Sequence, residues 1–147
     1  MLIKQISIFI PNRKGSLSEL TDILIAHKID IRAIAVFDTT EFGILRIVVD
    51  DPDKAVEILS GAGVVAKVSK VLAVEPEDKP GALNEIFHIL GDHNLNIEYI
   101  YSFIMRKTEM PYVVLKLDDQ ERGAKVLSAN GINVINKSEI YGEQELK

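Results

Sequence analysis

The sequence predicts an α+β protein built from two copies of a βαββαβ unit, each with an antiparallel sheet and its helices on one face. Two observations lead to this prediction. The chain of 147 residues repeats itself at an offset of 66 to 68 positions. In both copies, the apolar residues change from strand spacing to helix spacing and back in the same order.

The repeat is clearest in a polar loop. Residues 12–17 match residues 78–83 at an offset of 66, and apolar positions farther along keep that offset. The offset then becomes 68, which takes Gly63 to Gly131. The two additional residues fall near residues 106–110, where a polar hairpin loop tolerates an insertion at little entropic cost.

The first copy begins with an apolar, β-rich run and a polar loop, after which apolar residues have helical spacing. Ser16 and Glu19 have the spacing of a capping box at the start of this helix. Alternating residues and a turn then predict a hairpin, and Pro52 favours the start of a second helix. The expected elements are a strand at 3–10, a helix from 16 to 27, strands at 31–37 and 43–49, a helix opened by residues 50–53 and ended by Gly61 and Gly63, and a strand at 64–68.

The second copy follows the same order. Because β-α-β crossovers are right-handed, both helices of a copy are expected on one face of its sheet, as in a ferredoxin-like fold. We expect one domain at residues 1–69 and a second at residues 70–147. The expected elements of the second copy are a strand at 71–75, a helix at 82–92, a hairpin of 97–105 with 112–117, a helix at 121–129 and a strand at 132–140.

Composition excludes several kinds of site and partner. The chain has no cysteine, which removes disulfides, thiolate nucleophiles and cysteine-based metal sites. The net charge is −5, and residues 71–147 carry all of it; neither half has a basic stripe, so a nucleic-acid partner is disfavoured. No apolar run approaches the ~18 residues of a membrane span, and the N-terminus lacks a signal-peptide pattern. We therefore expect a cytoplasmic protein that does not bind membranes.

The loop before the first helix of each copy is the strongest candidate for a binding site. In both copies a polar residue precedes a glycine by three positions, and a leucine follows the glycine by two. Glycine lets a backbone approach a ligand closely, and the start of a helix presents unpaired N–H groups. Such a site suits the carboxylate of a free amino acid. The alternative interpretation is a plain turn with a helix cap.

Residues 78–83, ahead of a helix that ends in residues 94–97, resemble the ACT domain signature. The resemblance covers nearly the whole chain, twice, and is closest to small stand-alone tandem ACT proteins. It implies that the glycine loop of one copy and the start of the second strand of a neighbour together hold an amino acid. Two sites follow: Asn12, Arg13, Gly15, Ser16 and Leu17 with Asn96 and Tyr99, and Asp78, Pro80, Gly81, Ala82 and Leu83 with Asp30 and Arg32.

The two copies depart from the family pattern in different ways. Lys14 stands where proline is usual, and Asp78 stands where asparagine is common. An aspartate repels a ligand carboxylate unless it faces the ammonium group. Asn96 can donate and accept hydrogen bonds, whereas an ionised Asp30 only accepts. We expect the site with Asn96 to be the better amino-acid site. Tyr99 is expected to contribute to packing between the repeats or to a wall for the ligand side chain.

Other kinds of site have weaker support. His88 and His93 are five positions apart, whereas a metal-binding pair on one helix face prefers four, so no metal site is expected. Acidic residues at 50–53 and 118–121 are expected to be helix caps. The element order also occurs in RNA-binding modules, but the stacking aromatics are missing from the segment at 41–47. Acyl-phosphate hydrolases share the order too, and Arg13 only weakly matches their phosphate loop.

The function that we expect is therefore regulation by a bound amino acid held between ACT repeats, without enzymatic activity, catalytic residues or a cofactor. A homodimer and a separate enzyme are the expected protein partners. The alternative is a structural or assembly subunit, or a regulatory partner of a separate enzyme, with no ligand of its own.

Overall fold

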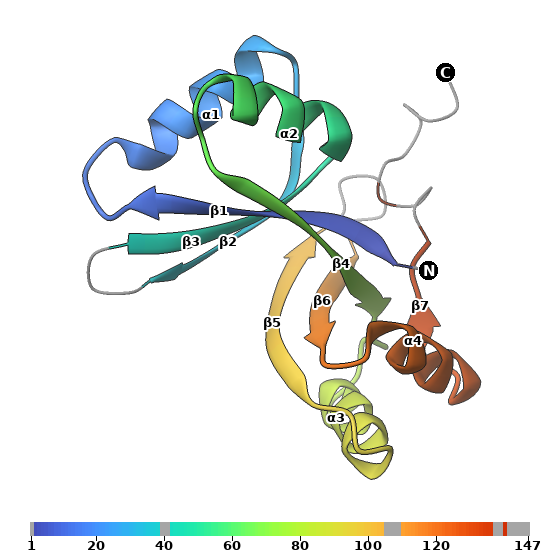
Figure 1. Cartoon of the computed structure of the whole chain (residues 1–147). Helices are drawn as coiled ribbons and strands as arrows, with labels where there is room; N and C mark the ends of the chain where they lie inside the picture. Colours follow the sequence, from blue (N-terminus) through green and yellow to red (C-terminus); the bar gives the residue numbers. More distant parts are fainter. Residues whose placement is uncertain (1, 39–41, 105–109, 137–139, 141–147) are drawn as a thin grey trace. The chain divides into compact units, whose positions relative to one another are not determined.

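The computed structural model describes residues 2–38, 42–104, 110–136 and 140 (Figure 1). The chain divides into two compact units, each of which is described by itself. The N-terminal unit contains residues 4–69, and the C-terminal unit contains residues 70–140 together with the N-terminal residues up to Ile3. No helix in these described residues is both long enough and apolar enough to cross a membrane.

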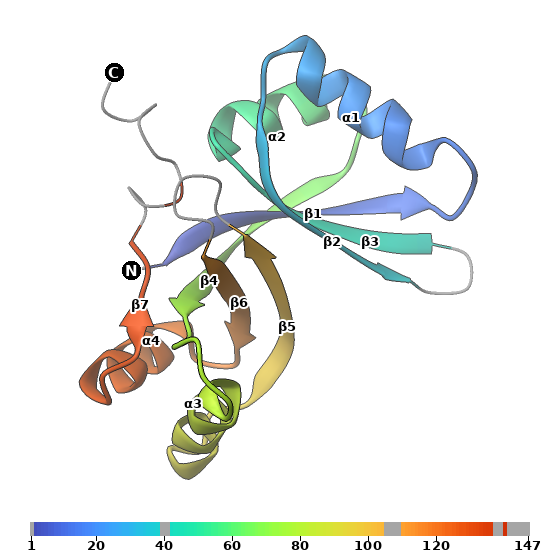
Figure 2. The same ribbon diagram turned by 180° about the vertical axis from the view of Figure 1, so that it is seen from behind.

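The N-terminal unit has a sheet in the order β2-β3-β1-β4, in which β3 pairs antiparallel with both β1 and β2. Its two helices lie side by side on one face of this sheet in both views (Figures 1 and 2). This arrangement is the one expected from right-handed crossovers. Its elements are β1 (Ile3–Pro11), α1 (Ser16–Ala26), β2 (Ile31–Asp38), β3 (Phe42–Val49), α2 (Pro52–Gly61) and the first part of β4 (Ala66–Glu75).

The C-terminal unit repeats this plan with the order β4-β6-β5, and β7 also pairs with β4. All of these pairings are antiparallel, so the predicted α+β class with ferredoxin-like repeats is confirmed. Its elements are the second part of β4, α3 (Ala82–Asp92), β5 (Ile97–Ile104), β6 (Pro111–Leu117), α4 (Gln120–Ala129) and β7 (Asn133–Val134).

Two predicted strand boundaries are wrong. Separate strands were expected at 64–68 and 71–75, but β4 is one uninterrupted strand, because no glycine or proline breaks the chain between them. The last strand was expected at 132–140, but β7 has only two residues. Asn136 is a poor strand former, which disfavours an extension of β7. Residues 137–139 of this prediction, and residue 105 of the predicted hairpin, lie outside the described residues.

Each unit has its own apolar core between its helices and its sheet. In the N-terminal unit, alternate residues of β1 and β3 point to the helices, as expected for a half-buried strand. The N-terminal core consists of Ile6, Ile8, Ile10, Leu20, Leu24, Ile29, Leu45, Ile47, Val49, Ala55 and Leu59. The C-terminal core consists of Leu72, Val74, Ile86, Leu90, Leu95, Val113, Leu115, Leu117, Ala124 and Leu127.

The second helix of each unit begins at an aspartate cap. The side chain of Asp51 accepts a hydrogen bond from the Lys54 amide at 3.2 Å, and that of Asp119 accepts one from the Arg122 amide, also at 3.2 Å. Pro52 occupies the first turn of α2, where a missing N–H group costs nothing. The expected helix caps are confirmed for Asp51 and Asp119, whereas the carboxylates of Asp50 and Asp118 accept hydrogen bonds from the amides of Asp30 and Asn96.

Candidate functional site

The two glycine loops have the same backbone conformation. Gly15 and Gly81 stand immediately before α1 and α3 with φ angles of 85° and 86°, in the left-handed region that favours glycine. In both loops an amide donates to the carbonyl two residues earlier, from Arg13 to Pro11 at 3.0 Å and from Lys79 to Glu77 at 2.9 Å. Duplicated sequence has therefore produced duplicated geometry at this position.

Both glycine turns are open. Among the described residues, a Cβ atom built on Gly81 would meet no atom within 4 Å, and one built on Gly15 would meet only side-chain oxygens of Glu19 and Ser18, at 3.9 and 4.0 Å. Space for a ligand therefore exists beside both glycines, as the amino-acid-binding interpretation requires.

The amide groups of the first helical turn are available at both loops. Within the described part of the chain, the amides of Leu17 and Ser18 donate no hydrogen bond, and neither do those of Leu83 and Asn84. Such amides at the start of a helix attract anions.

The predicted capping box at the start of α1 is wrong. The Ser16 hydroxyl donates to the Pro11 carbonyl at 2.8 Å, so it braces the loop against the end of β1. The Glu19 carboxylate accepts hydrogen bonds from Arg13. The left-handed conformation of Gly15 redirects the chain at the helix start, and no side chain caps α1 there.

An open groove borders each loop, between the first helix of the unit and the turn that follows the second helix. The groove of the N-terminal unit, here the N-terminal groove, has a volume of about 330 Å³ and is lined by Phe9, Ile10, Pro11, Arg13, Ser16, Glu19, Leu20, Ile23, Gly63, Val64 and Val65. The C-terminal groove has a volume of about 250 Å³ and is lined by Glu75, Pro76, Glu77, Asp78, Ala82, Glu85, Ile86, Met110, Gly131, Ile132 and Asn133.

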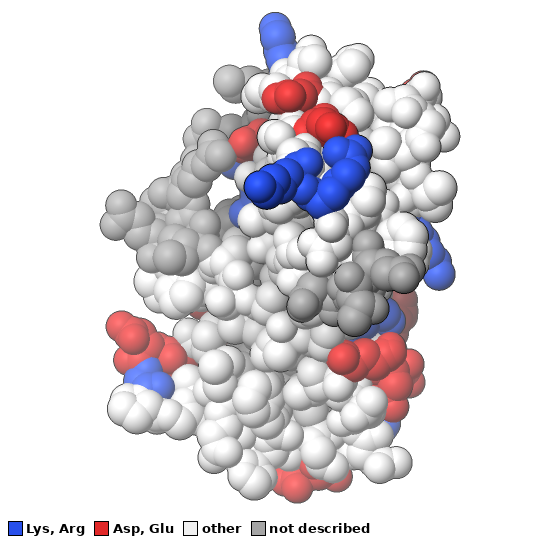
Figure 3. Space-filling model, turned by 90° about the vertical axis from the view of Figure 1, so that its left-hand side faces the viewer, with Lys and Arg blue, Asp and Glu red and all other residues white. Residues whose placement is uncertain are grey.

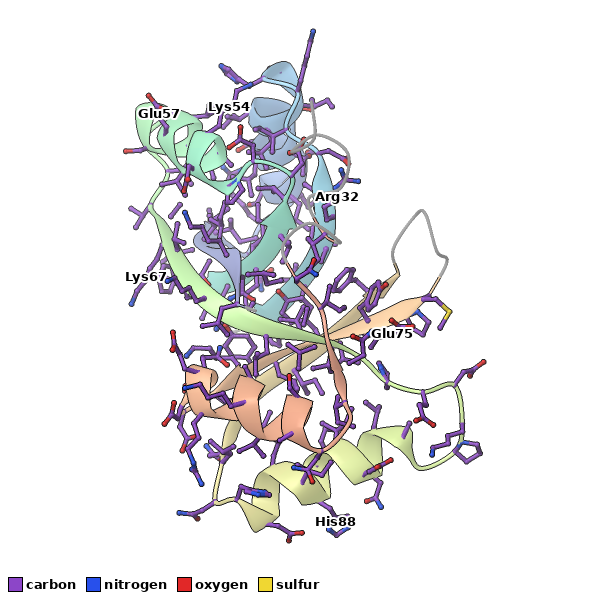
Figure 4. The ribbon with its side chains drawn as sticks, turned by 90° about the vertical axis from the view of Figure 1, so that its right-hand side faces the viewer. Arg32, Lys54, Glu57, Lys67, Glu75 and His88 are labelled. Carbon is purple, nitrogen blue, oxygen red and sulfur yellow. The ribbon has the colours of Figure 1, made fainter. Side chains whose placement is uncertain are left out.

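The grooves occupy equivalent positions but differ in chemistry. The offset of 66 takes Phe9 to Glu75 and Pro11 to Glu77, and the offset of 68 takes Val65 to Asn133. Glu75 lies at the end of β4, where the chain enters the loop that leads to α3 (Figure 4). The N-terminal groove is mainly apolar, whereas four carboxylates line the C-terminal groove.

An ion pair stands at the N-terminal groove. The Arg13 guanidinium donates from both of its terminal nitrogens to Glu19, at 3.2 and 2.9 Å. These hydrogen bonds, together with the charge of Arg13, lower the pKa of Glu19, and the same contacts raise the pKa of Arg13. At the other loop Lys79 pairs instead with Glu77 at 2.9 Å, and this hydrogen bond, followed by the charges of Glu77 and Glu85, raises the pKa of Lys79.

The ion pair leads to a pH prediction. Because Arg13 favours the ionised form of Glu19, its stabilising effect is fully present above the ordinary glutamate pKa of 4.5 and is lost as the pH falls through the lowered value. In the Arg13→Gln variant we expect the titration midpoint of the Glu19 side chain to rise towards the ordinary value, as followed by carboxyl ¹³C NMR. Lys79→Gln should leave this midpoint unchanged. An unchanged midpoint in Arg13→Gln would contradict the ion pair.

In each unit the glycine loop precedes the first helix, and the second strand begins after the opposite end of that helix. The amides of Asp30 and Asn96 donate to the carboxylates of Asp50 and Asp118, both at 3.0 Å. The Asp30 carboxylate also pairs with Arg32 on β2 at 3.2 Å (Figure 4). The Asn96 side chain is exposed. The predicted joining of each loop to the second strand of the other copy stays a prediction.

Within a unit, the predicted site residues fall into separate groups. Tyr99 pairs with Lys116, so it lies on the sheet face opposite α3 and α4, where it stacks on Tyr101 with 6.5 Å between ring centroids. Arg13 and Ser16 line the N-terminal groove, and Asp78 and Ala82 line the C-terminal groove. The remaining loop residues flank the grooves without lining them: Asn12, Gly15, Leu17, Pro80, Gly81 and Leu83.

The second wall of each groove was not recognised as part of a site in the sequence. Gly63 and Gly131 have φ angles of 78° and 80° and turn the chain after α2 and α4. The sequence identified them only as helix ends. The sequence nevertheless contained an indication of this wall, because the offset of 68 relates the same glycine turn in the two copies.

The histidines have local roles. Nδ1 of His27 and Nδ1 of His93 lie 3.1 and 2.8 Å from the carbonyl oxygens four residues earlier, those of Ile23 and Ile89. His88 lies on the exposed side of α3 (Figure 4). Within residues 2–38, 42–104, 110–136 and 140, no group of three or more histidine and acidic side chains has a geometry that fits a metal ion.

The surface charge on the face drawn in Figure 3 is mixed. Lysine and arginine side chains stand in small groups beside acidic ones, and most of that face is uncharged. This distribution differs from the continuous basic surface that nucleic-acid binding requires.

Comparisons with known proteins place the chain among duplicated domains. Residues 1–142 match the family described as ACT domain pair. The crystal structure of protein BT0572 from Bacteroides thetaiotaomicron is 31% identical, with a TM-score of 0.88 over 96% of both chains. The regulatory subunit of aspartate kinase from Thermus thermophilus, in a ligand-free form, is 19% identical, with a TM-score of 0.61 over 87% of this chain and 93% of that one. No curated protein sequence matches the chain.

Proposed function

Because the chain belongs to the ACT domain pair family, we propose that it is a regulatory protein that binds a free amino acid at its glycine loops. The observation that carries the proposal is the repeated open turn: a left-handed glycine, unpaired helix amides and an adjoining groove occur at the same place in both units. The helix start supplies partial positive charge for a ligand carboxylate. The groove supplies space for the rest of the molecule.

The further parts of the proposal concern assembly. The start of the second strand from the other copy, with Asn96 or Asp30, completes each site. Ligand binding shifts an equilibrium between arrangements of the protein by its difference in affinity for them. The protein acts in the cytoplasm, as a homodimer or on a separate enzyme, and is not itself an enzyme. The regulatory subunits of aspartate kinase have the same fold, which makes a separate enzyme a reasonable partner to test.

A thermal-shift screen of the twenty standard amino acids tests the proposal. A ligand at one hundred times its Kd stabilises the folded state by about 2.7 kcal/mol, if it binds only that state. For a chain of this size, that corresponds to an increase in Tm of roughly 5–10 °C. We expect at least one amino acid to give such an increase. If none does, the alternative of an assembly subunit without a ligand is favoured.

A glycine substitution tests the loop assignment in the same screen. Gly15→Val places a β-branched residue at a positive φ, so the loop must rearrange. We expect the Tm increment caused by the ligand to fall strongly in Gly15→Val, in Gly81→Val or in both. Gly91→Val is the matched control, since Gly91 is an exposed helical glycine with open space around it and no positive φ. Undiminished increments in both loop variants would refute the loop assignment.

A further inference from the structure

The N-terminal groove has an apolar interior and an exposed apolar rim. Ile10 and Leu20, both more than 90% buried, belong to the core of the unit and line the groove. Phe9 and Val65, on the rim, are 62% and 72% exposed. Large apolar side chains left in water around a concavity mark a binding surface, because covering them is favourable. The groove therefore suits an aliphatic group.

The volume of the N-terminal groove suits a small ligand. Binding pockets for small molecules usually have volumes of about 300–1,000 Å³. The N-terminal groove, at about 330 Å³, is at the small end of that range. A ligand the size of a single amino acid matches this volume.

The ion pair of Arg13 and Glu19 provides both signs of charge at one edge of this apolar groove. A guanidinium group has five N–H donors, and Glu19 engages two of its nitrogens, so donors remain for a second carboxylate. The Glu19 carboxylate can in turn accept hydrogen bonds from an ammonium group. A zwitterion with its carboxylate at Arg13 and its ammonium at Glu19 matches this arrangement, and an uncharged or singly charged ligand matches only part of it.

Among the residues that the structure describes, the C-terminal groove lacks both features. Glu75 and Asn133 replace the apolar rim residues, and the Asn133 amide donates to the Glu75 carboxylate at 2.9 Å. Lys79 is paired with Glu77 and does not line this groove. With Asp78 and Glu85 also present, the described lining of this groove is strongly acidic and repels a ligand carboxylate.

We propose that the N-terminal groove binds a free aliphatic amino acid, with its side chain between Phe9 and Val65 and its charged groups at Arg13 and Glu19, and that the C-terminal groove does not bind this ligand. The inference rests on the proposed function, and it adds the class of amino acid and the number of sites in a chain. The two units would then have equivalent loop backbones, with one groove that binds the ligand and one that does not.

Isothermal titration of the full chain with leucine and two analogues tests the charge recognition. 4-Methylpentanoate keeps the carboxylate and the aliphatic chain but has no ammonium, and 3-methylbutylamine has no carboxylate. We expect leucine to bind once per chain, and each analogue to bind about tenfold more weakly, since one charge-assisted hydrogen bond is lost. In Glu19→Gln, the affinity for leucine should fall by a similar factor, whereas the affinity for 4-methylpentanoate should not fall.

Substitutions on the rim test the location. Val65→Asp should weaken leucine binding by about tenfold or more, because it removes apolar contact and places a charge against the aliphatic side chain of the ligand. Ile25→Asp is the matched control, since Ile25 is 67% exposed on α1 and does not line the groove. Asn133→Asp makes the corresponding change in the C-terminal groove. Both controls should bind leucine as the unmodified protein does, and the Tm of each free variant shows that it is folded.

The outcomes separate the two proposals. If no amino acid binds, both this inference and the proposed function fail. If an amino acid binds but is polar, or if Val65→Asp binds it unchanged, the proposed function stands and the assignment of the groove is wrong. Two leucine molecules per chain, or loss of binding in Asn133→Asp, would overturn the exclusion of the C-terminal groove. The expected result is that one leucine binds per chain, that Val65→Asp and Glu19→Gln weaken this binding, and that the control variants leave it unchanged.

Discussion

Leu59→Ala and Leu127→Ala are each expected to lower the free energy of unfolding by about 2–5 kcal/mol, the range for removing a fully buried leucine side chain. The two leucines occupy equivalent positions on α2 and α4, and both are fully buried. Each side chain belongs to the core of its own unit. The cost combines the lost transfer of apolar surface from water with the cavity that remains.

Urea unfolding monitored by circular dichroism measures both effects. Ile25→Ala is the control, because this residue is mostly exposed and its removal leaves no cavity. We expect the control to change stability by less than about 1 kcal/mol. A loss of similar size in the control and in either leucine variant would mean that the corresponding core is not packed around that leucine.

The order of the elements could be predicted because each pattern occurs twice in the sequence. The glycine loop, the alternating hairpin and the acidic helix start recur at fixed offsets, so each copy supports the interpretation of the other. The errors arose where a local signal was missing or misleading. Ser69 and Lys70 contain no strand breaker, so the junction between the copies is continuous strand. The last apolar run has strand spacing but includes Asn136, and pairing stops early.

The sequence predicted the glycine loops of the candidate site but not the other residues that line the grooves. The glycines were identified because the same polar loop with a glycine ahead of a helix occurs in both copies. The opposite wall was not, because Phe9 and Val65 are far apart in sequence and meet only through the sheet order. The pairing of Arg13 with Glu19 spans a left-handed turn, and no helical spacing rule relates these two positions. The charge difference between the grooves comes instead from local sequence, because Glu75 and Glu77 stand where the first copy has Phe9 and Pro11.

Gly123→Ala is expected to destabilise the protein by about 1–2 kcal/mol, although alanine favours a helix over glycine by up to about 1 kcal/mol. A Cβ atom on Gly123 would overlap Cδ1 of Leu117 and would lie 3.4 Å from Cδ1 of Leu72. Both leucines are fully buried and belong to the C-terminal core. Gly91→Ala is the control: its Cβ meets no atom within 4 Å, so we expect it to stabilise the protein by about 0.5–1 kcal/mol.

The N-terminal unit indicates how the destabilisation can be relieved. At the positions equivalent to Gly123 and Leu117, it has Ala55 and Val49, so a larger helix residue faces a smaller strand residue. Introducing Leu117→Val into Gly123→Ala reproduces that pair and removes the atom that the new methyl group would contact. In a double-mutant cycle measured by urea unfolding, we expect the double variant to be more stable than the sum of the single effects by about 0.5–3 kcal/mol. Strict additivity would mean that the two positions do not share the packing inferred for them.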